Sequence, residues 1–362
     1  MKENVIKFTR GVPPPESFAT AKLAECAAAA LAEYGSVIQQ YGPAIGFKPL
    51  REWIAAEDNT AVERVIVGQG SLQLLDLAAH LIVSPGEPVY VESPSYDRTL
   101  TILRRAKARL RGFALGPDGL DVDEIEQRLA GGERPRFFYL IPDFQNPSGS
   151  VMAVEKRYAI ARLAQQYDFW VIEDSPYRAL RYRGEELPSI YSLIPERTLL
   201  MSSYSKTICP GLRVGYMVAP QVLIQPLVKM AEDTYINSSY ITQAMVFEFL
   251  RRGWLDSNLV ELKELYRQRL DGMLGCLDEH MADLATWTRP EGGFFIGLTL
   301  NHNRSIVRLM EEAQKAGLEL TDGRGFFPQG GGENFVRLPF CGVSLAEIEQ
   351  GIKILAQAVK AV

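Results

Sequence analysis

The stretch SSYSKTICPGLRVGY, residues 202–216, decides how the rest of the chain is interpreted. It follows the apolar run TLLMSSY (198–204) and leads into a second one, RVGYMVAP (213–220), so it joins two predicted strands. Lys206 stands at the end of the first strand, and Arg213 begins the second. A lysine that emerges from an apolar strand loses hydration, which lowers its pKa and prepares the amine for nucleophilic chemistry.

Short β-rich runs recur along the chain and alternate with helical stretches. The six runs are 63–68, 88–94, 136–142, 169–174, 198–204 and 213–220. The clearest helical patterns between them are residues 72–82 and 155–167. Because the runs are continuously apolar and are separated by helices, they indicate an α/β fold with a mostly parallel sheet covered on both faces.

The pattern changes after residue 228. Residues 263–281 predict one long amphipathic helix, and a strand, a helix, a strand and a final helix follow it. We therefore predict a large α/β domain of residues 38–262 and a smaller α+β domain of residues 1–37 and 263–362. We expect the proline-rich arm GVPPPESF and the alanine-rich helix after it to fold back against the smaller domain.

The composition narrows the classes of function. The 362 residues are 47% apolar and 23% charged, which is typical of a globular protein with a sizeable core. A net charge of -5 gives no basic field for nucleic acid or an anionic membrane. The four cysteines lack metal-site spacing, and the chain has three histidines (His80, His280, His302), so we expect reduced thiols and no metal. With no targeting or membrane-spanning pattern, we expect a cytoplasmic location.

Polar residues follow five of the predicted strands, in the segments GQGS, SPSY, QNPSG, EDSPY and SYSK. In open α/β sheets the carboxyl ends of the strands converge on the ligand site. Gly70 and Ser71 open a helix whose free N–H groups and dipole favour an anion. Asp174 ends an apolar strand, where a carboxylate needs a cation or a strong donor. Tyr96 could lie on a flat ring, and Arg213 could hold a phosphate.

Each of these residues has an ordinary structural alternative when it is taken alone. Ser71 or Asp174 could cap a helix, Tyr96 could pack in the core, Lys206 could extend to solvent, and Arg213 could form a salt bridge. Taken together they favour one ligand that offers an anion, a protonated ring nitrogen, a flat ring and an aldehyde. Pyridoxal 5'-phosphate has all four features.

The sequence resembles the class I and II aminotransferases of the fold-type I pyridoxal-phosphate family, in the branch of the aminoadipate and kynurenine aminotransferases. The likeness extends over nearly the whole chain and is carried by motifs such as GQGSLQLLDL, PDFQNPSG, VIEDSPYRALRY, SYSKTICPGLRVGY and GGGENFVRLPFC. The resemblance implies the fold-type I architecture and an aminotransferase. Its substrates would be an L-amino acid and a 2-oxo acid, with 2-oxoglutarate and glutamate as one pair, used in a ping-pong sequence.

The resemblance also implies roles at matching positions. Lys206 would bind the cofactor aldehyde covalently and then move the substrate proton, and Asp174 would hold the pyridine nitrogen protonated. Tyr96 would stack on the ring, while Asn146 and Tyr177 would hydrogen-bond its phenolic oxygen. The phosphate would contact Gly70, Ser71, Leu72, Ser203, Ser205 and Arg213. Tyr41 would reach the phosphate of the neighbouring subunit in a homodimer with shared active sites.

Substrate recognition would rest on Arg337, which would pair with the α-carboxylate beside Asn146. Arg10 in the N-terminal arm could bind the substrate side chain, although an ordinary solvated arginine fits the same sequence. A hydrophobic or aromatic amino donor is the favoured expectation. Leu72 replaces a glutamine that the family commonly has, and Gly297 stands where an aromatic residue is frequent, so we expect a wider pocket wall there.

Two alternatives stay open on the sequence. Another reaction on the same cofactor, such as an elimination, a decarboxylation or a cyclising step, would use the same lysine and aspartate. The cofactor-sensing half of a transcription regulator has a related domain, but it needs a DNA-binding winged helix ahead of this region, so we favour the enzyme.

Overall fold

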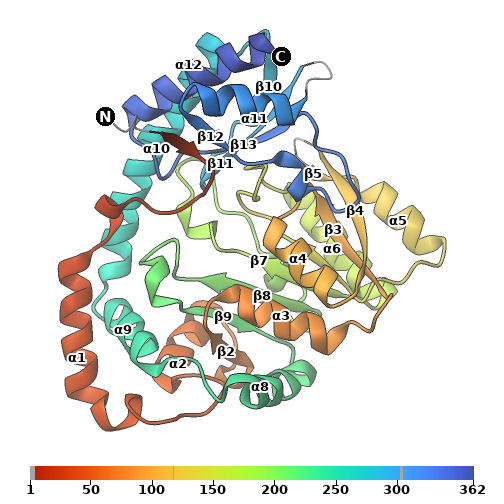
Figure 1. Cartoon of the computed structure of the whole chain (residues 1–362). Coiled ribbons are helices and arrows are strands. Elements are labelled where there is room, and N and C mark those ends of the chain that lie inside the picture. The colour runs from red at the N-terminus through yellow and green to blue at the C-terminus, as the bar shows by residue number, and fades with distance from the viewer. Residues whose placement is uncertain (1–4, 117, 302–304) are drawn as a thin grey trace.

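The computed structural model describes residues 5–116, 118–301 and 305–362 (Figure 1). Within these residues the centre of the molecule is an eight-stranded sheet with the order β2-β9-β8-β7-β6-β3-β4-β5. Its strands are β2 (Val65–Gly68), β3 (Pro88–Ser93), β4 (Arg109–Gly116), β5 (Gly119–Leu120), β6 (Phe137–Leu140), β7 (Trp170–Asp174), β8 (Thr198–Ser203) and β9 (Gly215–Val218). The five strands from β8 to β4 pair in parallel, whereas β9 is antiparallel to β8 and β2, and β5 is antiparallel to β4. The predicted mostly parallel sheet is confirmed.

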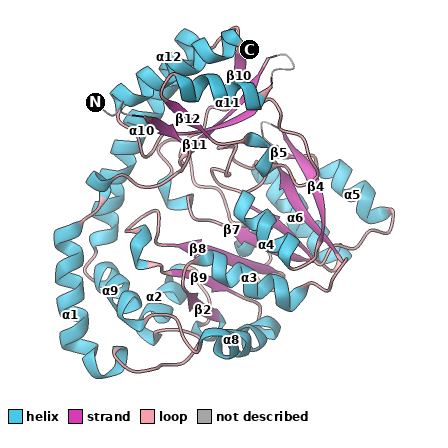
Figure 2. Cartoon of the chain, viewed as in Figure 1, coloured by secondary structure: helices cyan, strands magenta, loops and turns pink. Residues whose placement is uncertain are grey.

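Helices cover both faces of this sheet (Figure 2). Successive residues of β6 show why, since Tyr139 packs in the core cluster of one face and Phe138 in that of the other. The first face is covered by α3 (Ser71–Ile82), α4 (Asp97–Arg105) and α8 (Gln221–Tyr235). The second is covered by α2 (Lys48–Glu57), α5 (Val122–Ala130), α6 (Val154–Tyr167), α7 (Ile190–Leu193) and α9 (Tyr240–Arg251). Burial on both faces explains the continuous apolar runs in the sequence.

The C-terminal part forms a second, smaller layer above the carboxyl ends of the strands (Figure 1). Its antiparallel sheet has the order β10-β11-β13, with strands Ala285–Trp287, Phe295–Leu300 and Phe335–Pro339. The helices are α10 (Trp254–His280), α11 (Ile306–Lys315) and α12 (Leu345–Ala361), and β1 (Ile6–Phe8) pairs in parallel with β12 (Leu318–Leu320). The first described strand and the C-terminal helix therefore both lie in this part.

Helix α10 begins at Trp254, earlier than the predicted start at residue 263. Short 3₁₀ turns complete the chain at Pro15–Ser17, Val62–Arg64, Arg178–Leu180, Pro210–Leu212 and Gly323–Phe326. Across the described residues, none of the helices combines the length and the apolar character that crossing a membrane requires.

The alanine-rich helix α1 (Thr20–Ile38) lies elsewhere than expected, and the prediction that it folds back against the smaller part is wrong. It packs along α9 (Figure 1), and Cys26 and Ala30 are buried in one cluster with Phe249 of that helix. Ion pairs from Glu33 and Glu25 to Arg251 and Arg252 line the same contact. The domain boundaries at residues 38 and 262 stay a prediction.

Candidate active site

A pocket opens at the carboxyl ends of the central strands, beneath the smaller part of the molecule. It is lined by Gly70, Ser71, Leu72, Tyr96, Ile141, Asn146, Asp174, Pro176, Tyr177, Ser203, Ser205, Lys206 and Arg213. Residues far apart in the sequence meet here because parallel strands present their carboxyl ends at one edge of the sheet. Ile141 and Pro176 are additions to the sequence-based candidates. Ile141 directly follows β6 and Pro176 lies two residues after β7, but an apolar side chain there gives no chemical signal.

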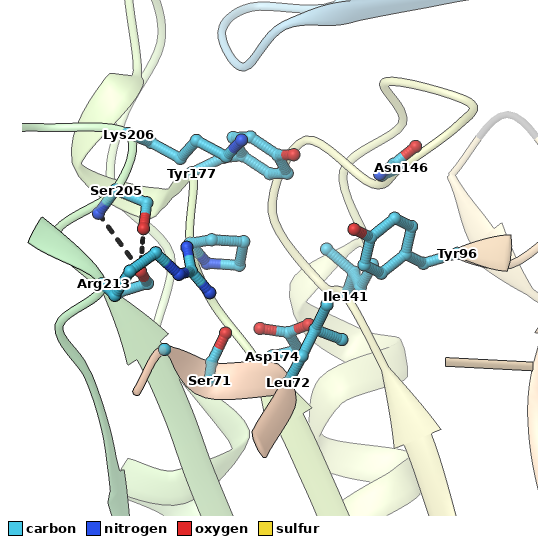
Figure 3. Close-up of a pocket in the computed structure, with 13 residues that line it drawn as sticks. Ser71, Leu72, Tyr96, Ile141, Asn146, Asp174, Tyr177, Ser205, Lys206 and Arg213 are labelled. Carbon is cyan, nitrogen blue, oxygen red and sulfur yellow. Dashed lines mark hydrogen bonds between the residues drawn. The ribbon is translucent and has the colours of Figure 1, made fainter. Parts of the chain in front are cut away.

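The pocket has two chemically distinct ends (Figure 3). Ser71, Ser205 and Arg213 gather at one end, and Tyr96 and Asn146 lie at the other. Asp174 lies between them at the floor, and Lys206 extends across the top beside Tyr177. A flat ligand with an anionic group would place that group beside Arg213.

Lys206 is largely buried in the connection between β8 and β9. Its Nζ donates a hydrogen bond of 3.1 Å to the carbonyl oxygen of Gly11, and it lies 5.5 Å from the ring centroid of Phe294. Burial lowers the pKa of the Lys206 amine, and the positive charges of Arg213 and Arg337 lower it further, while Cys341 and Asp174 act the other way. A larger share of the amine is therefore neutral and nucleophilic than in an exposed lysine.

Asp174 is the last residue of β7 and is buried at the floor of the pocket. The Tyr139 hydroxyl donates a 2.6 Å hydrogen bond to its Oδ2, while Oδ1 has no partner in the part of the chain that the structure describes. Burial raises the pKa of Asp174 to about 6, against the lowering effects of the Tyr139 hydrogen bond and the Lys206 charge. The site thus holds a desolvated carboxyl oxygen that lacks a donor.

The end of the pocket beside Arg213, which favours an anion, depends on two positions where the backbone comes close to other groups. Gly70 precedes α3 with a φ of 89°, a conformation that glycine adopts readily, and a Cβ there would collide with Nη2 of Arg213. A Cβ at Gly215 would collide with the backbone nitrogen of Ser71. The N-terminus of α3 and the Arg213 guanidinium therefore face the same space, and both favour an anion.

Two serines extend this end of the pocket. The Ser203 hydroxyl donates to the Ser205 hydroxyl at 2.9 Å, and the backbone N–H of Ser205 donates to Ser203 Oγ at 3.1 Å. Both residues are buried, so these hydroxyls have fixed positions at the pocket wall.

Arg337 lies outside the pocket lining but adjoins it through Asn146. From β13, its Nη1 donates to Asn146 Oδ1 at 3.1 Å, and its Nη2 donates to the carbonyl oxygen of Thr9 at 2.6 Å. The guanidinium lies 4.7 Å from the ring centroids of both Phe295 and Phe326. Its Nε is buried and, within the described residues, unpaired. Burial lowers the pKa of Arg337, and a carboxylate would pair with the open donor.

Tyr41 and Arg10 are the other two candidates outside the lining. Tyr41 follows α1 and is 75% exposed. Arg10 is exposed too, but it stands between two residues tied to the site, because Thr9 accepts from Arg337 and Gly11 accepts from Lys206. The N-terminal segment therefore contacts both Lys206 and Arg337.

Gly297 does not widen the pocket, and the expectation of a wider wall there is wrong. A Cβ at this position would lie 3.0 Å from the Cα of Ser148 and 3.2 Å from the ring of Phe335. The Gly297 N–H also donates to the Ser148 carbonyl oxygen at 3.1 Å. The backbone of the loop after β6 fills the space that a larger residue would need.

The described residues contain no group of three or more histidine, cysteine, aspartate or glutamate side chains that could hold a metal ion. His302, one of the three histidines, lies outside those residues.

Comparisons with known proteins agree with one another. The family model for aminotransferases of class I and II matches residues 3–355. A 2-aminoadipate transaminase of Thermus thermophilus is 33% identical over 363 residues, covering 99% of this chain and 91% of that protein. An aromatic-amino-acid aminotransferase of Thermococcus litoralis is 32% identical, covering 99% and 88%. The crystal structure of a Thermus thermophilus alpha-aminoadipate aminotransferase, complexed with N-(5'-phosphopyridoxyl)-L-leucine, matches with a TM-score of 0.94 at 33% identity, covering 99% of this chain and 93% of that one.

Proposed function

Because the chain belongs to the class I and II aminotransferases, we propose that it moves an amino group between an L-amino acid and a 2-oxo acid in a ping-pong sequence. The enzyme is an aminotransferase, and its cofactor is pyridoxal 5'-phosphate. We assign 2-oxoglutarate and glutamate as one substrate pair on the likeness to the family.

The main support for the proposal is that Lys206 and Asp174 line the same pocket, and that one carboxyl oxygen of Asp174 has no hydrogen-bond donor among the described residues. The residues present fit the cofactor. Within the part of the chain that the structure describes, Asp174 Oδ1 has no donor, and a protonated ring nitrogen would supply one. The N-terminus of α3 and the Arg213 guanidinium form an anion-binding end that suits a phosphate. The Lys206 amine could react with the aldehyde of the cofactor.

When bound, the cofactor supplies an electron sink for the bond that breaks at the substrate Cα. In this proposal Lys206 holds the cofactor, and its Nζ then moves the proton from the substrate Cα, which its lowered pKa favours. Asp174 would keep the ring nitrogen protonated. Tyr96 would cover the ring, and Asn146 and Tyr177 would donate to its phenolic oxygen.

The other lining residues would hold the phosphate in this proposal. They are the backbone around Gly70, the hydroxyls of Ser71, Ser203 and Ser205, the N–H of Leu72 and the guanidinium of Arg213, all from residues that line the pocket. The first N–H groups of a helix have no partner inside the helix, so those of Ser71 and Leu72 remain available to an anion.

Substrate binding would place the α-carboxylate on Arg337. The two flanking aromatic rings pack against the guanidinium and shield it from water, and its Nε has no partner among the described residues, so a bidentate pair with the carboxylate would form in a dry environment. The rings of Phe295 and Phe326 also favour a hydrophobic or aromatic donor side chain. Arg10, an exposed residue between Thr9 and Gly11, would bind the distal carboxylate of a dicarboxylic substrate.

We further propose a cytoplasmic homodimer with shared sites. Tyr41 is exposed in the segment after α1, where Gly42 donates to Asn237 Oδ1, and the neighbouring Ile236 is 50% exposed. A second subunit would cover these apolar side chains, and Tyr41 would then reach the phosphate of its neighbour.

The test is a panel of L-amino acids mixed with the cofactor-loaded protein without any acceptor. The proposal expects the absorption of the bound cofactor to change to that of its amine form, and 2-oxoglutarate to restore it. Parallel double-reciprocal plots would follow from the ping-pong sequence. A cofactor spectrum that changes only when both substrates are present would contradict it. In the same panel, Arg10→Gln should weaken dicarboxylic substrates and spare aromatic ones, and equal losses would contradict its proposed role.

A further inference from the structure

The loop after β6 carries three buried polar side chains that reach three different parts of the molecule. Asp143 and Gln145 are each 1% exposed, and Asn146 is 4% exposed. Asp143 binds Arg157 of α6, Gln145 donates to Glu92 of β3 at 3.1 Å, and Asn146 accepts from Arg337 of β13. The proposed function uses Asn146 alone, so the purpose of Asp143 needs its own explanation.

Arg157 is entirely buried, and each of its five N–H donors has an acceptor. Nη2 donates to Asp143 Oδ1 at 2.8 Å and Nη1 to Asp143 Oδ2 at 3.2 Å, which makes the ion pair bidentate. The other three donors reach the carbonyl oxygens of Met152, Pro142 and Pro188, each at 3.0 Å. Two of these carbonyls belong to the loop itself. Arg157 therefore fixes the loop at both of its ends and at Asp143 between them.

A second arginine, Arg181, also binds Asp143. Nη2 of Arg181 donates to Asp143 Oδ1 at 3.3 Å, and its guanidinium lies 4.8 Å from the ring centroid of Phe144. Nη1 of Arg181 donates to Glu291 Oε2 at 3.0 Å, just before β11 of the smaller part. The backbone of Arg181 also bridges to Gly292. The contacts of Asp143 thus continue to the part of the molecule that carries Arg337.

We propose that Asp143 is a positioning residue for Asn146. Clamped between Arg157 and Arg181, it holds the loop so that the Asn146 amide faces both the pocket and Arg337. Only two residues separate Asp143 from Asn146, so a displacement of one carries to the other. Because Asp143 is inaccessible and does not line the pocket, its effect on the site passes through Asn146. This inference rests on the proposed contact between Asn146 and the phenolic oxygen of the cofactor.

The test measures the pH midpoint of the visible absorption of the cofactor-loaded protein. A donor on the phenolic oxygen weakens the attraction of that oxygen for the proton of the chromophore, so loss of the donor raises the midpoint. Asn146→Ala sets the size of the full effect. Asp143→Asn should raise the midpoint in the same direction by a twofold to tenfold change in proton affinity, roughly 0.3 to 1 pH unit. A residue that only stabilises the fold would lower the melting temperature without moving this midpoint.

Asp118→Asn is the matched control. Its carboxylate pairs with Lys156, the neighbour of Arg157 on α6, but the Asp118 side chain is 64% exposed, and the midpoint should stay unchanged. If Asp143→Asn does not fold, Arg181→Gln removes one of the two guanidinium groups and should give a smaller shift in the same direction. If Asn146→Ala shifts the midpoint but the folded variants of Asp143 and Arg181 keep the wild-type midpoint, the inference is overturned while the proposed cofactor contact stands. An unshifted Asn146→Ala would overturn the proposed cofactor contact and, with it, the inference.

Discussion

The Tyr139 hydroxyl donates a 2.6 Å hydrogen bond to Oδ2 of Asp174, and both side chains are buried beneath the pocket. The second carboxyl oxygen, Oδ1, finds no donor anywhere in the described residues. A buried carboxylate with half of its acceptors unpaired destabilises the protein without cofactor, and a ring N–H would complete its pairing. This relationship gives predictions for stability and for binding.

Replacement of Asp174 by Asn should stabilise the cofactor-free protein in a pH-dependent way. The pKa of Asp174 is about 6 in the folded protein against an ordinary value of 3.8, so the folded protein holds the proton more tightly than the unfolded chain. Stability is therefore lost as the pH rises between these values, by roughly 3 kcal/mol in all. Because asparagine does not ionise, the variant does not lose this stability, and its amide oxygen still accepts the hydrogen bond from the Tyr139 hydroxyl.

Urea denaturation of the cofactor-free wild type and Asp174→Asn measures the difference. We expect the advantage of the variant to grow by about 1.4 kcal/mol between pH 5 and pH 7.5. If the variant is no more stable than the wild type, or if the difference in the free energy of unfolding is the same at both pH values, then ionisation of Asp174 does not destabilise the folded protein.

Removal of the Tyr139 hydroxyl should weaken cofactor binding. In Tyr139→Phe the Asp174 carboxylate loses a charge-assisted hydrogen bond, a loss of about 1.5 to 3 kcal/mol. We expect the dissociation constant of the cofactor to rise about tenfold to a hundredfold, measured by titration of the cofactor-free protein. Tyr158→Phe, on the exposed surface of α6, is the control and should bind as the wild type does. Equal affinities for all three proteins would refute the role of the hydroxyl.

Gly70 should matter for the anion rather than for its backbone conformation alone. Gly70 and Gly86 share a φ of 89°, so alanine strains the backbone at either position. A Cβ at Gly70 also collides with Arg213, whereas one at Gly86 meets nothing within 4 Å in the described structure. Both variants should lose stability, Gly70→Ala the more because of the collision, but only Gly70→Ala should weaken cofactor binding in calorimetry. Equal affinity in the two variants would place the phosphate elsewhere.

Arg337 should act on the substrate and not on the cofactor. Arg337→Gln removes the cation proposed for the α-carboxylate, so kcat/KM for any amino acid should fall by roughly two to three orders of magnitude. The affinity for the cofactor should stay within about twofold, since Arg337 is outside the pocket lining. Arg324→Gln, which breaks an exposed ion pair with Asp322, is the matched control. A cofactor affinity that falls as far as kcat/KM would contradict this division.

The sequence predicts the sheet and the place of the pocket because both depend on local patterns. Strands buried on two faces produce continuous apolar runs, and the polar residues after them meet at one edge of the sheet. The run of β4, RLRGFALG, carries two arginines and two glycines, and so it lacks that pattern. The sequence does not predict the position of helix α1, because its evenly distributed alanines do not specify a packing partner. Its contact with α9 decides where it lies.

The sequence alone does not identify the groups that support the site, and the reason is physical. Tyr139 lies in the apolar run FFYL, where an aromatic residue indicates core packing, and its bond to Asp174 depends on how β6 and β7 pair. Arg157 belongs to a helix rich in charges, EKRYAIARL, where an arginine is normally solvated. Its burial against Asp143 follows from the fold of the loop after β6, which no local pattern encodes.

The central claim is that the amine of Lys206 binds the aldehyde of the cofactor covalently. Borohydride reduction of the cofactor-loaded protein, followed by digestion and mass spectrometry, measures this directly. We expect a single stable adduct, on the peptide that contains Lys206, and its loss in Lys206→Ala. An unmodified Lys206, or an adduct on any other lysine, would show that this amine does not hold the cofactor.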